Sequence, residues 1–336
     1  MSSGWKTVNH AVALAAAWVF GGEVLAEPFA FITNQKASTV SMIDTASGLV
    51  VKTLPVGKDP AGIAVDRAAH YAVITSPSVG EIALLDAQSG VSRGVMKVGE
   101  GPLGVAISPD GLRAYVADFY GHFMSVIDLS EASILKRVPV GHYPSGVLVS
   151  PDGGSIFIAE REDNTVSLID ATALTVIKTV SVGRHPFGLY LDQGRGRLYV
   201  ANVESNDLSV LDAKTLAPVG LVKVGERPYA VASALGGRRV FVTNQYDSTV
   251  SVVDAESLAV IATVPVGEYP EGIAGHPDDH QVWVANWFDN TVTVLDAESL
   301  RVRKTIQVGD GARAFGEFIS LGAPRSNASS QSPFLR

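Results

Sequence analysis

Residues 241–270 read FVTNQYDSTVSVVDAESLAVIATVPVGEYP and form the unit from which nearly the whole chain is built. A Val-Gly-x-x-Pro corner recurs every 42 residues, with alanine replacing the proline in the last copy, at Val56, Val98, Val140, Val182, Val224, Val266 and Val308. An aspartate ends a run of typical β-strand residues in the same register at Asp44, Asp86, Asp128, Asp170, Asp212, Asp254 and Asp296. A Phe/Tyr-Val-Thr/Ala-Asn run begins at Phe31, Val73 (the weakest copy), Tyr115, Phe157, Tyr199, Phe241 and Trp283. Three unrelated markers with one period indicate a repeat architecture.

Each repeat is composed of short runs rich in valine, isoleucine and threonine that end in turn residues, which is typical of β-strands. Four short strands joined by tight turns and repeated around an axis make a propeller blade. Seven units of 42 residues account for residues 27–320. The sequence therefore predicts an all-β fold, a seven-bladed β-propeller of four-stranded blades, with the recurrent aromatic residues packed between the blades.

The ends of the chain suggest how the ring closes. The chain starts on the second strand type of a blade, so the first blade lacks its innermost strand. Residues 313–319 follow the seventh corner and have the composition of the missing strand. We expect this C-terminal strand to pair with the N-terminal blade beside residues 29–34 and to close the circle.

Two features of the repeat have a structural interpretation. The corner glycine is expected to supply backbone angles that a side chain would forbid, and the proline fixes its own φ. The Asp-Ala-x-Ser/Thr segments are expected to be turns in which the carboxylate accepts hydrogen bonds from backbone N–H groups downstream. The glycines do not have the spacing of a phosphate-binding loop.

Composition excludes several classes of site. Of the 336 residues, 46% are hydrophobic and 18% are charged, as in a well-buried globular protein. The chain has no cysteine, which excludes disulfides, thiolate metal sites and covalent c-type haem. The formal net charge of −8 argues against nucleic acid as a partner. We expect a monomer.

The ends of the sequence differ from the repeats. Residues 1–26 have a lysine in the n-region, an apolar run and a small-residue cleavage site, which together predict a signal peptide. The mature protein is then periplasmic or secreted and has no membrane anchor. Residues 321–336 are rich in serine and are expected to be a disordered tail.

The recurrent motifs resemble a known family. The YVAN at Tyr199, FVTN at Phe241 and WVAN at Trp283 look like the YVTN family of β-propeller repeat proteins, and the likeness covers nearly the whole mature chain. That family includes YncE-like periplasmic proteins, archaeal surface-layer proteins and propellers associated with quinoprotein oxidation pathways. The resemblance implies a binding or accessory protein in such a pathway, and it transfers no catalytic residue.

The loops at one end of the propeller differ most between repeats. These are the corners and the loops between the second and third strands of each blade, which surround the mouth of the central channel. Aromatic and ionisable residues gather there, and a concave mouth of this composition is a default ligand site. The predicted ligand-binding residues are His142, Tyr143, Arg161, Arg184, His185, Phe187, Arg227, Tyr229, Tyr246, Tyr269, Glu271, Trp287 and Arg313.

The sequence favours a non-catalytic module that presents this face to a protein partner or a small anionic ligand. Four arginines would suit an anion through charge-assisted hydrogen bonds: Arg161, Arg184, Arg227 and Arg313. One alternative is a lactonase- or lyase-type enzyme with a base among Glu160, Glu268 and Glu271 and an acid in His142 or His185. A second is a haem or metal carrier that uses His122, His142 and His185. No pair of residues is singled out by spacing, and the sequence names no cofactor.

Overall fold

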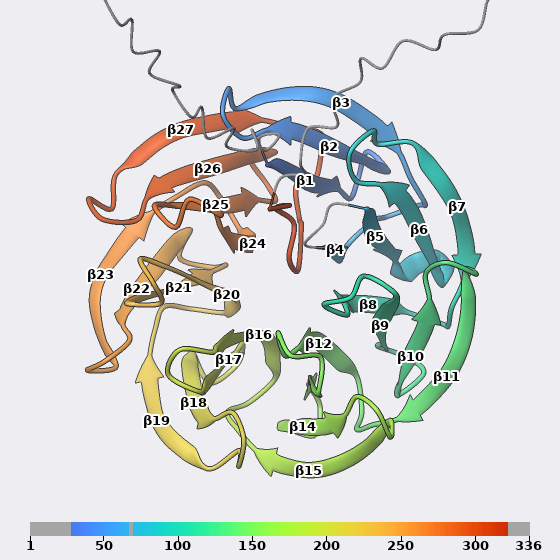
Figure 1. Cartoon of the computed structure of the whole chain (residues 1–336). Coiled ribbons are helices and arrows are strands. Elements are labelled where there is room, and N and C mark those ends of the chain that lie inside the picture. The colour runs from blue at the N-terminus through green and yellow to red at the C-terminus, as the bar shows by residue number, and fades with distance from the viewer. Residues whose placement is uncertain (1–27, 67–69, 322–336) are drawn as a thin grey trace, which may run out of the picture.

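The structure, a computed structural model, describes residues 28–66 and 70–321 and confirms the seven-bladed β-propeller. Seven antiparallel sheets surround a central axis in chain order (Figure 1). Within the described residues the single helix is η1 (Pro77–Val79), and none is long and apolar enough to cross a membrane. The predicted signal peptide (1–26) lies outside the described residues, as does the predicted tail apart from Leu321.

The strands follow the repeat, from the axis outwards in each blade. Blades one to three contain β1 (Phe29–Asn34), β2 (Thr39–Asp44), β3 (Leu49–Pro55), β4 (Ile63–Val65), β5 (Tyr71–Ser76), β6 (Glu81–Asp86), β7 (Ser92–Lys97), β8 (Pro102–Ile107), β9 (Arg113–Asp118), β10 (Phe123–Asp128) and β11 (Ser133–Pro139). Blades four and five contain β12 (Pro144–Val149), β13 (Ser155–Glu160), β14 (Thr165–Asp170), β15 (Thr175–Ser181), β16 (Pro186–Asp192), β17 (Arg197–Asn202), β18 (Asp207–Asp212) and β19 (Pro218–Lys223). Blades six and seven contain β20 (Pro228–Ala234), β21 (Arg239–Asn244), β22 (Thr249–Asp254), β23 (Ala259–Pro265), β24 (Pro270–Gly275), β25 (Gln281–Asn286), β26 (Thr291–Asp296) and β27 (Val302–Gln307).

The hydrophobic core lies between the blades. The two middle strands of a blade, such as β21 and β22, are almost entirely buried because both of their faces pack on neighbouring blades. The outer strand, such as β23, is mostly exposed. The recurrent aromatic residues are buried as predicted, at Tyr115, Phe157, Tyr199, Phe241 and Trp283.

The threonine of the repeated motif joins one blade to the next. The Oγ1 of Thr243 donates a hydrogen bond to the carbonyl of Glu271, 3.2 Å away on the innermost strand of the following blade. Thr75 makes the same bond to the carbonyl of Leu103 at 2.8 Å. Since both hydroxyls are buried, each bond satisfies a polar group that would otherwise be costly to bury.

The asparagine of the motif holds the corner. Asn244 Nδ2 donates to Thr249 Oγ1 and Ser251 Oγ, both at 2.9 Å, and the amide group lies against the corner glycine Gly225. A Cβ at Gly225 would stand 2.6 Å from Asn244 Cγ. None of the corner glycines has a positive φ, so the expectation that they supply special backbone angles is wrong. Glycine is needed because a side chain at Gly225 would collide with Asn244 and with Asp247, whose Oδ2 would lie 2.4 Å from the new Cβ.

A second set of glycines sets the spacing of the innermost strands. A Cβ at Gly62 would lie 2.1 Å from the carbonyl oxygen of Leu103 in the next blade, and one at Gly104 would lie 2.0 Å from that of Ser145. The same close approach recurs at Gly146, Gly188 and Gly272. At these positions the backbones of adjacent innermost strands approach so closely around the axis that only glycine fits.

The chain closes the ring differently from the expected strand. The first blade has three strands, and residues 313–319 form none, because Ala314 (φ 49°) and Gly316 (φ 125°) leave the extended conformation. The segment runs between the first two blades and makes isolated bridges to both, which are Ala30–Ile319, Asn34–Ala312 and Gly62–Phe315. Backbone hydrogen bonds from Phe31 N to Phe318 O (2.8 Å) and from Val65 N to Glu317 O (2.9 Å) accompany them.

The repeated aspartates cap turns as the sequence predicts. Asp254 Oδ1 accepts hydrogen bonds from Ser257 N at 2.8 Å and Ser257 Oγ at 2.7 Å. Such bonds favour the ionised carboxylate, and the pKa is lowered in all seven repeats, at Asp44, Asp86, Asp128, Asp170, Asp212, Asp254 and Asp296. At Asp86 burial raises the pKa, but the bonds from Ser89 and Arg93 outweigh it and lower the pKa to about 2.

These lowered pKa values predict acid sensitivity. An aspartate with a depressed pKa in the folded state stabilises the fold above its unfolded value of 3.8, and this contribution is lost as the pH falls towards about 2. We expect the melting temperature to be level from about pH 7 to pH 5 and to drop steeply below about pH 4. D86N, which keeps an acceptor for the turn and does not titrate, should give a shallower drop in calorimetry. An equally steep drop in D86N would contradict this account.

The corner glycine gives a second prediction. G225A forces a methyl group against Asn244 and should destabilise the fold by about 1–3 kcal/mol, the usual cost of overpacking. The matched control is G154A, where the nearest atom to a new Cβ lies 3.5 Å away and φ is not positive. Urea unfolding of both variants compares the costs. Equal stability of the two variants would show that the corner has room for a side chain.

Candidate functional site

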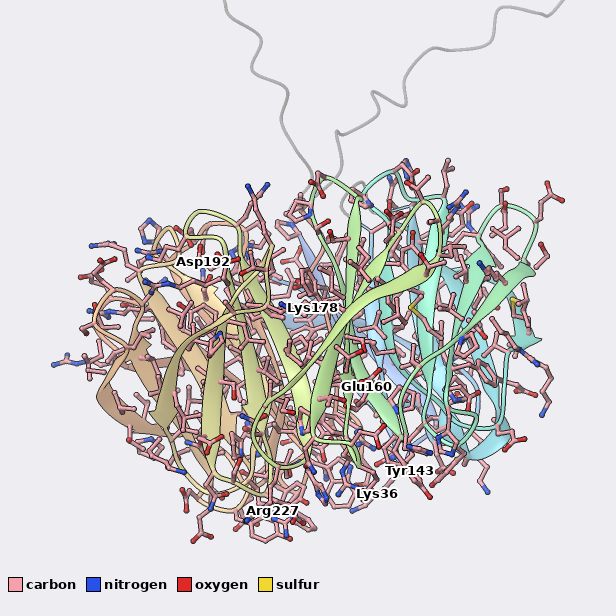
Figure 2. All side chains as sticks on the ribbon, turned by 90° about the horizontal axis from the view of Figure 1, so that it is seen from below. Lys36, Tyr143, Glu160, Lys178, Asp192 and Arg227 are labelled. Carbon is pink, nitrogen blue, oxygen red and sulfur yellow. The ribbon has the colours of Figure 1, made fainter. Side chains whose placement is uncertain are left out.

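The predicted site residues come from one end of the propeller, which we call the corner face. It consists of the corners and of the loops between the second and third strands, and hydrogen bonds join the two sets, as from Arg161 N to Tyr143 O (3.2 Å). Figure 2 shows Lys36, Tyr143 and Arg227 at this end and Asp192 towards the other, which we call the turn face. The predicted convergence of loops is therefore present.

The backbone fixes where the corner side chains point. The second residue of the corner insert has φ between 52° and 56° at Tyr143, His185, Arg227 and Tyr269. This left-handed conformation is uncommon for residues with side chains. A side chain of the preceding blade stabilises it by accepting the N–H, with Asn164 Oδ1 2.8 Å from His185 N and Asn206 Oδ1 3.0 Å from Arg227 N.

His122 takes the place of the asparagine in its own blade. Its Nδ1 accepts a hydrogen bond from Tyr143 N at 3.1 Å, as the Oδ1 of Asn164 and Asn206 does elsewhere. This nitrogen is thus used by the fold. His142 pairs instead with Asp163, with Nδ1 2.9 Å from Oδ1. In the part of the chain that the structure describes, no group of three or more potential ligands could hold a metal ion, so the three histidines considered as ligands are not brought together as one site.

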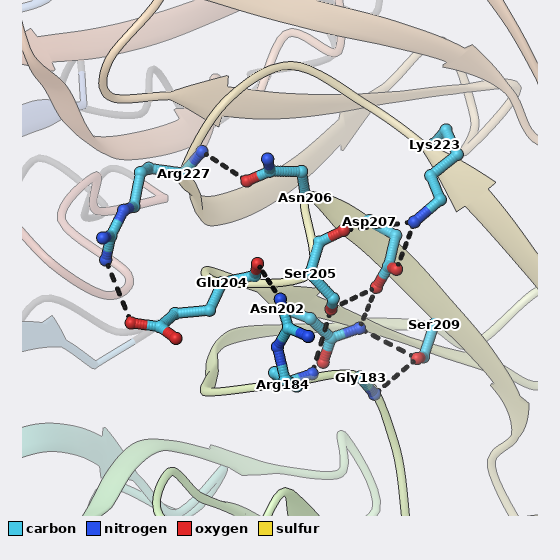
Figure 3. Close-up of polar contacts among 10 residues, drawn as sticks. All are labelled: Gly183, Arg184, Asn202, Glu204, Ser205, Asn206, Asp207, Ser209, Lys223 and Arg227. Atoms are coloured by element: carbon cyan, nitrogen blue, oxygen red, sulfur yellow. Dashed lines mark hydrogen bonds and ion pairs between the residues drawn. The ribbon is translucent and has the colours of Figure 1, made fainter.

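The corner-face arginines have partners already. Arg227 Nη1 lies 3.6 Å from Glu204 Oε1, and Arg184 Nη2 donates to the carbonyl of Glu204 at 3.0 Å (Figure 3). Arg161 pairs with Glu162. His185 stands between the two carboxylates, 3.7 Å from Glu162 and 3.3 Å from Glu204. The network links three blades and offsets the positive charge that an anionic ligand would need.

Aromatic side chains form two clusters on the corner face. One consists of Phe119, Tyr120, His122, His142 and Tyr143, with ring centroids 5.0–6.3 Å apart. The other consists of Tyr246, Tyr269, Trp287 and Phe288, with Lys36 Nζ 4.0 Å from the centre of the Trp287 ring. Large parts of these clusters face outward, since Tyr120, Tyr246 and Phe288 are 56%, 58% and 53% exposed.

Four of the predicted site residues lie at the channel centre, where Phe187, Tyr229 and Glu271 are buried and Arg313 is partly buried. The rings of Phe187, Tyr229 and Phe315 pack against one another in tilted and edge-to-face arrangements, with centroids 4.2–5.5 Å apart, and form what we call the plug. Beside it, Arg313 Nε forms an ion pair with Glu271 Oε2 at 2.7 Å, and Arg313 Nη2 donates to Tyr229 OH at 2.6 Å. These residues hold the closing segment against the last two blades rather than standing open to a ligand.

Burial and charge act in opposite directions within this pair. Burial raises the pKa of Glu271 above its usual value, while the Arg313 guanidinium and Gln245 oppose that rise. Burial would lower the pKa of Arg313, but the Glu271 carboxylate and Tyr229 outweigh it, so its pKa is raised. Arg313 is therefore charged, and the carboxylate of Glu271 is the main group that neutralises this positive charge.

Two of the three glutamates considered for catalysis, Glu160 and Glu271, have side chains that are used by the fold. Glu160 is 2% exposed and accepts bonds from Gly141 N at 2.9 Å and Ser167 Oγ at 2.7 Å. It occupies the position that the motif asparagine holds in other blades. Glu271 belongs to the buried ion pair described above. Glu268 lies at the corner, where its N–H donates to Asp289 at 2.7 Å. No acid–base pair among these candidates is formed in the described residues.

A cavity that sequence reasoning missed opens at the turn face. It has a volume of about 580 Å³ and is lined by the six innermost strands and the closing segment. Its charged lining residues are Asp66, Asp192 and Glu317. One signal was present in the repeat, since aspartate stands at 66 and 192 where serine stands at 108 and 150.

Comparison with known proteins agrees with this fold. The family described as YNCE-like beta-propeller matches residues 219–319, which confirms the resemblance noted in the motifs. No curated protein matches the chain significantly.

Solved structures share the architecture at low sequence identity. Hydrazine synthase of Kuenenia stuttgartiensis is 21% identical with a TM-score of 0.73, over 84% of this chain and 99% of that chain. A functionally unknown protein of Desulfotomaculum acetoxidans is 17% identical with a TM-score of 0.76, over 88% and 99% of the two chains. Dihydro-heme d1 dehydrogenase NirN is 13% identical with a TM-score of 0.67, over 88% and 76%. These likenesses show the fold alone.

The buried ion pair predicts a large stability effect. R313A leaves Glu271 buried without its partner and should cost about 3–5 kcal/mol. The control R303A breaks the exposed pair with Asp296 and should cost under about 1 kcal/mol. The double variant E271Q/R313M removes both charges and should recover part of the loss. Chemical unfolding measures all three, and equal stability of R313A and R303A would contradict the role given to Arg313.

Proposed function

We propose that this propeller is an exported, non-catalytic accessory module that docks its corner face on a protein partner. The observation that carries the proposal is the exposure of Tyr120, Tyr246 and Phe288 on one face. They belong to two separate clusters, one at blades three and four and the other at blades six and seven. Tyrosine, tryptophan and arginine are enriched in the energetically dominant centres of protein interfaces. Exposed aromatic clusters of this kind are typical of a docking surface.

The pairing of the arginines favours a protein over a small anion. Arg161 and Arg227 already contact glutamates, so an anion would have to displace a carboxylate from each. A protein partner can use the aromatic clusters and leave these ion pairs at the rim, where exposed charges contribute little affinity but guide orientation. The corner residues are also held by backbone and side-chain hydrogen bonds, which lowers the entropy lost on binding.

The setting we propose is an oxidation pathway outside the cytoplasm. The signal peptide predicted at residues 1–26 supports export. The accessory role is what the motif resemblance to YncE-like propellers implies, and the YNCE-like family model matches residues 219–319. Two structural neighbours are a hydrazine synthase and a dihydro-heme d1 dehydrogenase, which both have redox roles. On this proposal the partner is a redox enzyme of the same compartment.

Site-specific crosslinking in intact cells tests the docking surface. A photoreactive phenylalanine replaces Tyr246 or Phe288 on the corner face, or Ile177, which is 59% exposed on the outer strand β15. We expect one discrete adduct from both corner positions and none from Ile177. Adding Y120S/F288S to the Tyr246 probe should reduce the adduct at least about tenfold, because both clusters lose contact area.

Two outcomes would overturn the proposal. One is the absence of any adduct from both corner positions in cells that export the protein. The other is the same adduct from Ile177, which would mean random collision rather than docking. Mass spectrometry of the adduct identifies the partner, and an adduct with a second copy of this chain would replace the accessory role by self-association.

A further inference from the structure

Each blade ends in an outer strand that has no partner along its outer edge in the part of the chain that the structure describes. These strands are β3, β7, β11, β15, β19, β23 and β27, and they form the rim of the propeller (Figure 1). The edge of a sheet carries backbone N–H and C=O groups that can pair with another chain. Proteins usually prevent such pairing with charged side chains on the edge strand, lysine in particular.

A lysine stands in the middle of four of these outer strands, at Lys52, Lys136, Lys178 and Lys304, which share one position in the repeat. Each lysine donates a hydrogen bond to a turn carbonyl of the following blade, as Lys178 Nζ does to Thr215 O at 2.5 Å. In the other three outer strands this position is occupied by Gly94, Gly220 and Ala262. The edges of these three strands therefore lack the central positive charge.

Two of the three strands are unsuited to pairing for other reasons. Residues 92–96 of β7 include the charged Arg93, and Gly94 leaves the extended conformation at φ 136°. Residues 218–222 of β19 begin with Pro218, which has no N–H to donate, and Gly220 weakens the middle of the strand. A register shift interrupts the pairing of every outer strand with its neighbour, so this irregularity does not distinguish one edge from another.

The remaining strand, β23, has an apolar edge that is complementary to itself. It contains no charged residue, and Val260 and Ile261 are exposed. Residues 260–264 read Val-Ile-Ala-Thr-Val. Antiparallel pairing of two copies about Ala262 places Val260 opposite Val264 and Ile261 opposite Thr263. β-Branched residues suit such cross-strand pairs, whereas a lysine at the central position would face a second lysine.

We propose that two copies of this chain associate at the rim through antiparallel pairing of β23 with its own copy. The two four-stranded sheets of blade six then become one continuous sheet. The twofold axis passes beside Ala262, so the contact is closed and adds no third copy. On this proposal the chain is a dimer rather than the monomer expected from the sequence. The contact leaves the corner face free and is independent of the docking proposed there.

Engineered cysteines test the register, since the chain has no cysteine of its own. In the proposed dimer A262C faces its copy with Cα atoms about 4.5–5.5 Å apart, which suits a disulfide. The control V260C lies on the same strand but about 14 Å from its copy, which is too far for a disulfide. With copper phenanthroline as oxidant, we expect A262C to give at least about tenfold more linked dimer than V260C. No linked dimer from A262C, or equal yields from the two variants, would overturn the proposal.

Sedimentation equilibrium of the full exported chain measures the association itself. A262K places on β23 the lysine that β15 has at Lys178, so the fold should accept it. The dissociation constant of the dimer should rise at least about tenfold, because the pairing now opposes two positive charges. The control I177K adds the same charge to the exposed surface of β15 and should leave the dimer unchanged. An unmodified chain that stays monomeric up to about 1 mM, or an equal change in both variants, would contradict the proposal.

Discussion

Close contact between backbone and side chain at the blade junctions is the constraint on which the rest of the propeller depends. At each corner a glycine lies against a polar side chain of the next blade, and at the axis glycines such as Gly104 lie against a neighbouring carbonyl group. A propeller blade cannot bury its own two faces, so its stability comes from its neighbours. The contacts at the corners and the axis fix the distance and angle at which those faces meet.

The same structural task is done by different residues in different blades. The polar partner of the corner glycine is asparagine in four blades, whereas Ser76, Asp118 and Glu160 occupy this position in the others. His122 likewise replaces an asparagine in its loop. Variation between repeats is therefore weak evidence of function by itself. Such variation becomes informative where the new residue adds a property that the fold does not require. An example is the charge of an aspartate in a turn that serine can also cap.

The repeat period was enough to predict the number of blades, the strand order and the packing of the aromatic residues, because these follow from local pattern. The closing segment was not predictable in the same way. Its composition is that of a strand, but Ala314 and Gly316 adopt positive φ where the segment passes between two blades. For the site, the sequence predicted that the loops of the corner face meet at one end of the propeller, and the structure brings them together there. The sequence could not foresee the ion pair of Glu271 and Arg313, whose partners meet only once the ring is complete, nor a cavity lined by the innermost strands of six blades.

The plug of Phe187, Tyr229 and Phe315 blocks the central channel, so the cavity beyond it opens at the turn face. Any molecule that enters the cavity must leave through the same opening, so the same residues at the turn face control both entry and exit. Water cannot pass through the channel from one face to the other. A molecule that enters the cavity therefore displaces water through the same opening. Because the plug lies between the corner face and this cavity, a contact made at the corner face leaves the opening at the turn face uncovered.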